Sequence, residues 1–123
     1  MSRSWIVGGA LRDELLGREV TDIDIAVEGD PERAARELAA EVGGPVFQLS
    51  EAFGAWRVVD RREGRVYDFA PLQGEAIEDD LAKRDFSVNA MARARDGGKL
   101  IDPLGGRADL ETGTLRVLGP AAS

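Results

Sequence analysis

The sequence predicts a small α/β domain in which helices flank one mixed β-sheet. The stretch DIDIAV, residues 22–27, alternates acidic and apolar side chains, the pattern of a strand with one buried face. The stretch GDPERAARELAAEVGG carries the start and stop signals of a helix. A chain of 123 residues with 43% hydrophobic residues is large enough for one core. We therefore expect one domain over residues 1–123.

The first half of the chain predicts two strands and two helices in alternation. Trp5–Val7 has the apolar character of a short buried strand, and Ala10–Leu16 follows it as a helix closed by a glycine. The strand 22–27 comes next. The second helix is the most clearly marked, because Asp30 is a good N-cap, Pro31 fits the first helical position and a glycine pair follows its end.

The middle of the chain predicts three further strands. The segments PVFQL and AWRVVD, residues 45–49 and 55–60, are rich in β-formers. The turn RREG then leads into RVYDFA, residues 65–70. A hairpin over residues 55–70 follows from this spacing.

The last third predicts less regular structure. We expect a loop or short helix through Leu81, then a helix from about Ser87 that ends before Gly97. The stretch KLIDPLGG, residues 99–106, reads as a strand and a turn. No internal repeat or linker interrupts the chain, so no complete second domain is expected within it.

Composition excludes several classes of chemistry. The chain has no Cys and no His, which removes thiolate nucleophiles, disulfides, imidazole bases and zinc or haem sites. Its 23 acidic residues suit a hard cation held by oxygen ligands, Mg²⁺ or alternatively Mn²⁺. The net charge of -7 argues against a broad basic surface for nucleic acid. Without a signal peptide or a run of 18 apolar residues, we expect a cytoplasmic protein.

Asp22 and Asp24 are the strongest candidates for metal ligands. Two carboxylates at positions i and i+2 of a strand point the same way, with Cα atoms roughly 7 Å apart, so both can reach one metal cluster. This arrangement suits phosphoryl or nucleotidyl transfer by two cations. A solvent-exposed sheet face would show the same spacing of acids, so this motif alone is weak evidence for a metal site.

Gly8 and Gly9 stand where a strand is expected to turn into a helix. Without Cβ atoms they let backbone N–H groups approach a phosphate, although Gly-Gly is also an ordinary tight turn. Neither a P-loop nor a dinucleotide-binding glycine motif is present. Arg12 can contact a triphosphate or pair with an acidic neighbour such as Asp13.

Asp68 is the candidate for a third carboxylate. It lies in an apolar strand, where a metal ion or a buried arginine would each compensate its charge. Asp60, at the end of the preceding strand, is expected to face a turn. Further along, KRDFSVNAMA places Lys83, Arg84 and Asp85 before a predicted N-cap; the stretch is either a solvated turn or a set of contacts to phosphate and ribose.

Taken together, these stretches resemble the head (catalytic) domain of the family that contains class II CCA-adding tRNA nucleotidyltransferases and poly(A) polymerases. The matching stretches are GGALRD, DIDIAV, YDFAPLQGEAIEDDLAKRDFSVNAMA and LIDPLGGRADLETGTLRVL. The resemblance implies a polymerase-beta-like nucleotidyltransferase fold with a small mixed sheet flanked by helices. It also implies transfer of a nucleotide from CTP or ATP to an RNA 3′ hydroxyl, such as the tRNA 3′ end, with release of pyrophosphate.

The resemblance assigns roles to ten residues of this chain. Two Mg²⁺ ions would be bound by Asp22 and Asp24, with Asp68 as the third catalytic carboxylate. The nucleotide would be bound by Gly8, Gly9, Arg12, Lys83, Arg84, Asp85 and Asn89, with the glycines and Arg12 on the triphosphate and Arg84 and Asp85 on the ribose.

The sequence departs from the family pattern at three places. Lys83 stands where the family usually has arginine, which keeps the charge but loses the bidentate geometry. Gln73 stands where many members have arginine, so a phosphate or pairing contact is not expected there. The chain stops at GPAAS, where the family continues into a helical neck whose E-D-x-x-R motif selects the base; the neck, body and tail domains are expected to be absent. An excised fragment, a reduced stand-alone enzyme and one half of a split protein remain open. The alternative to an enzyme is therefore a nucleotide-binding head that depends on a separate neck or RNA-binding chain.

Overall fold

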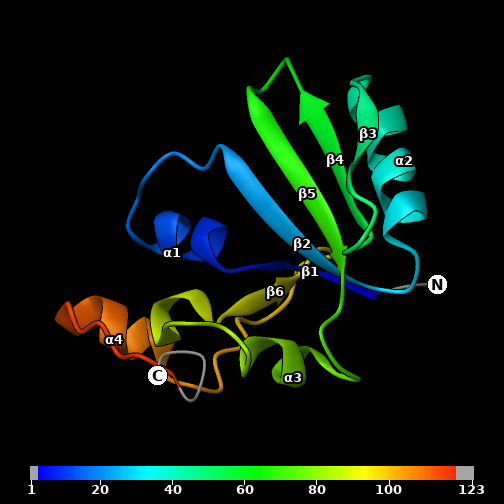
Figure 1. Ribbon diagram of the computed structural model, residues 1–123. Helices are drawn as coiled ribbons and strands as arrows, with labels where there is room; N and C mark the ends of the chain where they lie inside the picture. Colours follow the sequence, from blue (N-terminus) through cyan, green and yellow to red (C-terminus); the bar gives the residue numbers. More distant parts are fainter. Residues whose placement is uncertain (1–2, 119–123) are drawn as a thin grey trace.

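The structure is a computed structural model that describes residues 3–118; the stretch GPAAS lies outside the described residues. Figure 1 shows strands at the centre of the molecule with helices at both ends of the sheet. The elements, in chain order, are β1 (Arg3–Val7), α1 (Gly9–Leu15), β2 (Asp22–Glu28), α2 (Pro31–Val42), β3 (Val46–Ser50), β4 (Ala55–Asp60), β5 (Arg65–Pro71), α3 (Ile77–Leu81), the 3-10 turn η1 (Ser87–Asn89), β6 (Ala92–Ala94) and α4 (Gly106–Thr112).

The six strands form one mixed sheet, as predicted. Their order is β3-β4-β5-β2-β1-β6. Strands β2 and β5 pair in parallel, whereas every other neighbouring pair is antiparallel. The two segments that carry the predicted carboxylates, 22–28 and 65–71, are therefore neighbours at the middle of the sheet although 36 residues separate them in sequence.

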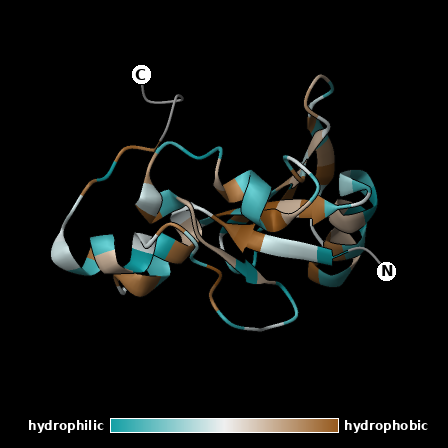
Figure 2. Cartoon of the chain, turned by 90° about the horizontal axis from the view of Figure 1, so that it is seen from below, coloured by the Kyte–Doolittle hydropathy of each residue, from teal (hydrophilic) through white to brown (hydrophobic). Residues whose placement is uncertain are grey.

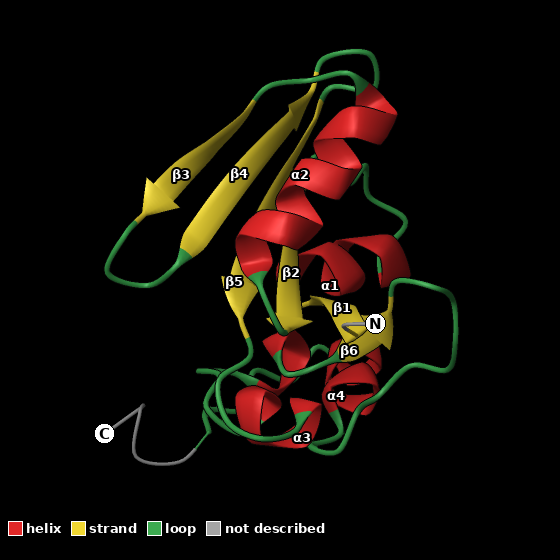
Figure 3. Cartoon of the chain, turned by 90° about the vertical axis from the view of Figure 1, so that its right-hand side faces the viewer, coloured by secondary structure: helices red, strands yellow, loops and turns green. Residues whose placement is uncertain are grey.

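The alternation of β2 divides its side chains between two faces, as the sequence predicts. Ile23, Ile25 and Val27 pack into one hydrophobic cluster, to which α2 contributes Ala35 and Leu38. Figure 3 shows α1 and α2 together on this side of the strands. Helix α2 begins and ends where predicted, because the Asp30 side chain accepts a hydrogen bond from Glu32 N and Gly43 adopts the left-handed conformation at its end.

The opposite face carries a second cluster near α3. Trp5 and Val7 of β1 and Ala26 of β2 are buried there with Ile77 and Leu81 of α3. In Figure 2 the hydrophobic residues colour the strands at the centre, while much of the chain looping around them is hydrophilic. Among residues 3–118 no helix has the length and apolar character needed to cross a membrane.

The helix predicted from Ser87 toward Gly97 is wrong. Only a single 3-10 turn forms at Ser87–Asn89, and Ala92–Ala94 is the edge strand β6, paired with β1. The apolar run before it is buried, and a short buried run has no periodicity that separates strand from helix. Ser87 is not an N-cap either, since its hydroxyl donates a hydrogen bond to the Asp109 carboxylate.

The strand predicted over residues 99–106 is reduced to one β-bridge, between Ala92 and Ile101. After it, Asp102 accepts hydrogen bonds from the backbone N–H groups of Gly106 and Arg107 and so starts helix α4, which was not predicted. The two glycines at this helix start read as a turn in the sequence. Gly106 is required by packing, because a Cβ there would lie 2.0 Å from the carbonyl oxygen of Ser87.

Candidate active site

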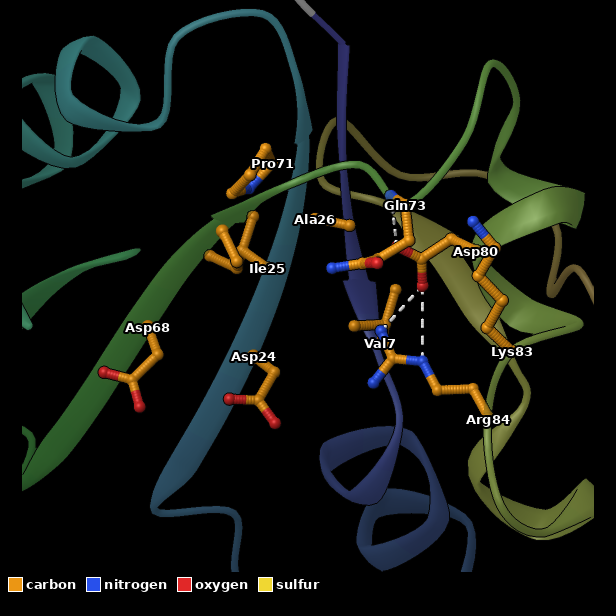
Figure 4. Close-up of a pocket in the computed structure, with 11 residues that line it drawn as sticks. Val7, Asp24, Ile25, Ala26, Asp68, Pro71, Gln73, Asp80, Lys83 and Arg84 are labelled. Atoms are coloured by element: carbon orange, nitrogen blue, oxygen red, sulfur yellow. Dashed lines mark hydrogen bonds and ion pairs between the residues drawn. The ribbon is translucent and has the colours of Figure 1, made fainter. Parts of the chain in front are cut away.

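A row of charged side chains crosses the middle of the sheet. The strand register places Asp24 of β2 beside Asp68 of β5, and Asp68 opposite Arg57 of β4. Neighbouring residues of paired strands point to the same face, so these three side chains share one side of the sheet. Figure 4 shows the Asp24 and Asp68 carboxylates side by side on adjacent strands. Asp22, two residues before Asp24, is exposed on this same face.

Asp24 is the acid whose protonation the structure perturbs. Although its surface is exposed, the protein mass on the cavity side removes part of the water around its carboxylate, and this desolvation is the main reason that its pKa is raised. The negative charge of Asp68 raises the pKa further, while Arg84 works in the opposite direction. A cation bound at Asp24 would relieve both penalties.

Asp68 is compensated by an arginine, one of the two partners its sequence context allowed. Arg57 donates from Nε to Oδ1 at 2.7 Å and from Nη2 to Oδ2 at 2.9 Å, a two-pronged ion pair. The hydrogen bond to Asp68 is the main reason that the pKa of Arg57 is raised. Asp60 faces its turn as predicted, where it accepts hydrogen bonds from Arg62 N and Glu63 N.

A cavity of about 320 Å³ opens beside these carboxylates. Its wall includes Asp24 and Asp68 on one side and Lys83 and Arg84 on the other, as Figure 4 shows. Two acids on one wall and two basic side chains on the other suit a ligand that carries both phosphate groups and cations.

Arg84 is held in this wall by Asp80. The guanidinium donates from Nε and Nη2 to Asp80 Oδ1, at 3.2 and 2.8 Å, and the other oxygen of Asp80 accepts from Gln73 N at 2.9 Å. Because Gln73 contributes its backbone, the contact does not require the arginine that the family usually has there. Asp80 is only 1% exposed, so its pair with Arg84 is a fixed part of the site.

The glycine turn and the segment after α3 meet at the same end of the cavity. Gly8 is buried with φ of 71°, and a Cβ at this residue would lie 3.8 Å from Nη1 of Arg84 and 3.7 Å from the carbonyl oxygen of Asn89. Arg12 donates from Nη1 to Asn89 Oδ1 at 3.1 Å and from Nε to Asp13 Oδ1 at 3.3 Å. The structure therefore brings Gly8, Gly9, Arg12, Arg84 and Asn89 together from two distant stretches of sequence.

Six of the ten predicted site residues do not line the cavity: Gly8, Gly9, Arg12, Asp22, Asp85 and Asn89. Asp22 is two residues before Asp24 along β2, and Asp85 is exposed beside Arg84. Sequence reasoning missed Asp80 and Arg57. The i,i+4 spacing of Asp80 and Arg84 is a signal for an ion pair on one helical face; the partnership of Arg57 with Asp68 depends on the sheet register.

The donor set fits a magnesium site that the substrate completes. Among residues 3–118 no three Asp, Glu, His or Cys side chains gather into a metal-binding group. Magnesium is commonly held by one or two carboxylates together with water and substrate phosphates, so Asp22 and Asp24 suffice as the protein ligands. No ion pair between described residues includes either of them, which leaves both carboxylates available to a cation.

Comparison with known proteins identifies the domain. The family model described as the poly A polymerase head domain matches residues 4–116. The chain belongs to this family. Its sheet and its strand acids are therefore those of a poly A polymerase head domain, and the predicted resemblance is confirmed.

Relatives of this head domain act on tRNA. The chain is 48% identical over 119 residues to the CC-adding tRNA nucleotidyltransferase of Geobacter sulfurreducens, covering 97% of this chain and 28% of that protein. It is 50% identical over 114 residues to the A-adding tRNA nucleotidyltransferase of Deinococcus radiodurans, covering 92% and 25%. The chain thus spans between a quarter and three tenths of the length of these relatives.

Solved structures share the head-domain fold. A tRNA-processing enzyme with CTP superposes with a TM-score of 0.87 at 39% identity, covering 98% of this chain and 34% of the other. A tRNA nucleotidyltransferase complexed with a primer tRNA and an incoming ATP analogue gives 0.85 at 39% identity, covering 98% and 37%. The fold class predicted from the sequence is confirmed.

Proposed function

We propose that this chain is the catalytic head of an RNA nucleotidyltransferase. It transfers a nucleotide from CTP or ATP to an RNA 3′ hydroxyl, that of a tRNA in the first instance, and releases pyrophosphate. The observation that carries the proposal is a pair of carboxylates that no ion pair between described residues includes: Asp24 lines a cavity whose far wall is basic, and Asp22 lies two residues before it on the same face of β2. The activities of the tRNA-processing relatives support it.

The basic side of the cavity binds the nucleotide. Lys83 serves the phosphates, and Arg84, which keeps its orientation through Asp80, serves the ribose. Gly8 and Gly9 allow the phosphates to approach the backbone, while Arg12, held by Asn89, faces the same end. Asp85 stands next to Arg84 at the sugar. These contacts fix parts that every ribonucleoside triphosphate has in common.

The acidic side of the cavity carries the chemistry. Asp22 and Asp24 would hold two Mg²⁺ ions, which would lower the pKa of the attacking hydroxyl and neutralise the charge of the leaving pyrophosphate. The RNA 3′ oxygen forms a bond to the α-phosphorus as the bond from that phosphorus to the bridging β-phosphate oxygen breaks. Asp68 retains a second lone pair on each oxygen beside its bonds to Arg57, so it can accept the hydroxyl proton.

Extension of RNA by the purified chain tests this function. Labelled CTP or ATP, Mg²⁺ and tRNA that lacks its 3′-terminal CCA should give a longer RNA. Asp22→Asn and Asp24→Asn should each abolish the extension while circular dichroism shows an intact fold. Near wild-type extension by either variant would contradict the assignment of the metal ligands.

A second candidate is a nucleotide-binding head that turns over only with a separate neck or RNA-binding chain. The observation that favours it is that the contacts assigned around the cavity serve only phosphate, metal and sugar, so none of them selects a base. In the same experiment this candidate predicts binding of CTP and ATP without RNA extension. The cytoplasmic location and the extent of the head over residues 1–123 stay predictions.

A further inference from the structure

Arg57 is a cation near the site that the sequence analysis did not single out. It lies on β4, two strands away from Asp24, and it does not line the cavity. Its guanidinium engages both oxygens of Asp68. With 35% of the Arg57 side chain and 27% of the Asp68 side chain exposed, the pair is partly shielded from water on an otherwise open part of the sheet.

The other cations near the acids have different partners. Arg84 is paired with Asp80, and Arg12 donates to Asn89 and Asp13. No ion pair within residues 3–118 joins a cation to Asp22 or Asp24. Among the described residues, Arg57 is therefore the cation that is ion-paired with an acid of this row, Asp68, while the charge of Arg84 acts on Asp24 without an ion pair.

We propose that Arg57 is a positioning residue of the catalytic row: it holds Asp68 beside Asp24 and sets the cation affinity of the site by its permanent charge. This inference rests on the proposed function, because it assumes that Asp22 and Asp24 bind metal. The two hydrogen bonds from Arg57 fix the Asp68 carboxylate in one orientation. Each of its oxygens then keeps a lone pair available to the substrate. The charge prevents Asp68 from adding a full negative charge to the metal site.

The expected size of the effect follows from the sheet spacing. Two strand spacings separate Arg57 from Asp24, roughly 10 Å. At this distance one unit charge changes the affinity for a divalent ion about fourfold in the weak, bulk-water limit of Coulomb's law at low salt. Removing the Arg57 charge should therefore tighten cation binding. If Arg57 had only a structural role, its removal would disorder the row of acids and weaken cation binding.

Binding of Mn²⁺ alone to the metal-free chain at low ionic strength tests the proposal. Electron paramagnetic resonance of the unbound ion gives both the dissociation constant and the number of ions bound. We expect Arg57→Gln to bind Mn²⁺ about fourfold more tightly than wild type and to melt at a lower temperature without metal. Asp68→Asn should have the opposite effect on affinity, because it leaves the Arg57 charge uncompensated.

Two further variants separate charge from geometry. Arg57→Lys keeps the charge but loses the fork, so its Mn²⁺ affinity should stay within about twofold of wild type. Arg33→Gln is the matched control, because Arg33 pairs with Glu37 on the exposed surface of α2, away from the row of acids, and should leave the affinity unchanged. Unchanged or weaker binding by Arg57→Gln overturns the role of Arg57. If Asp24→Asn leaves wild-type binding intact, the metal site itself, and with it the proposed function, is wrong.

Discussion

Replacing Asp24 with asparagine should stabilise the protein when no metal is present. Asparagine has nearly the same shape as aspartate, so the substitution removes the charge while leaving the packing of β2 unchanged. Asp24 lies beside Asp68, and its pKa is raised by desolvation and by that neighbouring charge. Desolvation and the Asp68 charge both destabilise the ionised form of Asp24 in the folded state, and neither acts on the neutral asparagine of the variant.

The magnitude follows from the spacing of the two strands. Carboxylates on neighbouring strands lie roughly 5 Å apart, where two like charges repel by about 0.8 kcal/mol in the dielectric of water. Arg57 offsets part of the Asp68 charge, while desolvation of Asp24 adds to the penalty. We therefore expect a gain of about 0.5–1 kcal/mol in the free energy of unfolding, or about 2–4 °C in Tm for a domain of this size.

The gain should depend on pH with a definite sign. A raised pKa means that folded Asp24 binds a proton more readily than the unfolded chain does. The stability contributed by its protonation is complete below the ordinary value of 3.8 and is lost as the pH rises through the folded-state pKa. Asp24→Asn should thus exceed wild type in stability at pH 7.5 and lose that advantage toward pH 4.

Thermal unfolding in EDTA at pH 7.5 and at pH 4.5 measures both quantities. Repeating the scan with Mg²⁺ should raise the Tm of wild type more than that of the variant, because the variant has lost a ligand. Asp96→Asn, an exposed acid in the turn after β6, is the control for the loss of one negative charge. A Tm difference between Asp24→Asn and wild type that is zero, negative or the same at both pH values would refute the electrostatic reasoning.

The remaining predictions concern selectivity for the sugar, the packing of Gly106 against Ser87, and selectivity for the base. Asp85→Ala should narrow the preference for NTP over dNTP by roughly 1–3 kcal/mol, measured as the ratio of kcat/KM values. Gly106→Ala should lower the free energy of unfolding by roughly 1–3 kcal/mol in urea titrations, because its Cβ would meet the Ser87 carbonyl at 2.0 Å. The chain alone should bind ATP, CTP, GTP and UTP within about tenfold of one another in calorimetric titrations with Mg²⁺, because the assigned contacts touch only phosphate, metal and sugar.

Local signals in the sequence were enough for the elements that carry the acids. The alternation in 22–27 correctly predicted that Ile23, Ile25 and Val27 are buried on one face, although Ala26 on the other face is buried as well. The cap residues of α2 correctly predicted both of its ends. The hairpin over residues 55–70 formed as expected. In each case the feature depends on residues that are near one another in the chain.

The errors arose where distant contacts decide the structure. Residues 90–92 are fully buried between β1 and the cluster under α3, so tertiary pairing makes a strand of a stretch that favours a helix by composition. The Asp109 carboxylate accepts hydrogen bonds from Ser87 and Arg116, and its pKa is lowered first by the Ser87 bond. The Ser87–Asp109 hydrogen bond ties α4 to η1, and it cannot be predicted from the sequence of either element alone.

The position of the proposed metal-binding acids is set by the apolar side of the same strands. Ile25 pairs with Phe69 in the register that also pairs Asp24 with Asp68, and both apolar side chains are buried, with 2% and 0% exposed. A slip of one residue between β2 and β5 would turn a buried side chain to solvent and one acid into the core, so the hydrophobic cluster excludes it. The core on one face of the sheet therefore fixes the geometry of the catalytic row on the other. Because the two acids are 44 positions apart in the sequence, this shared register, rather than either motif, brings Asp24 and Asp68 together.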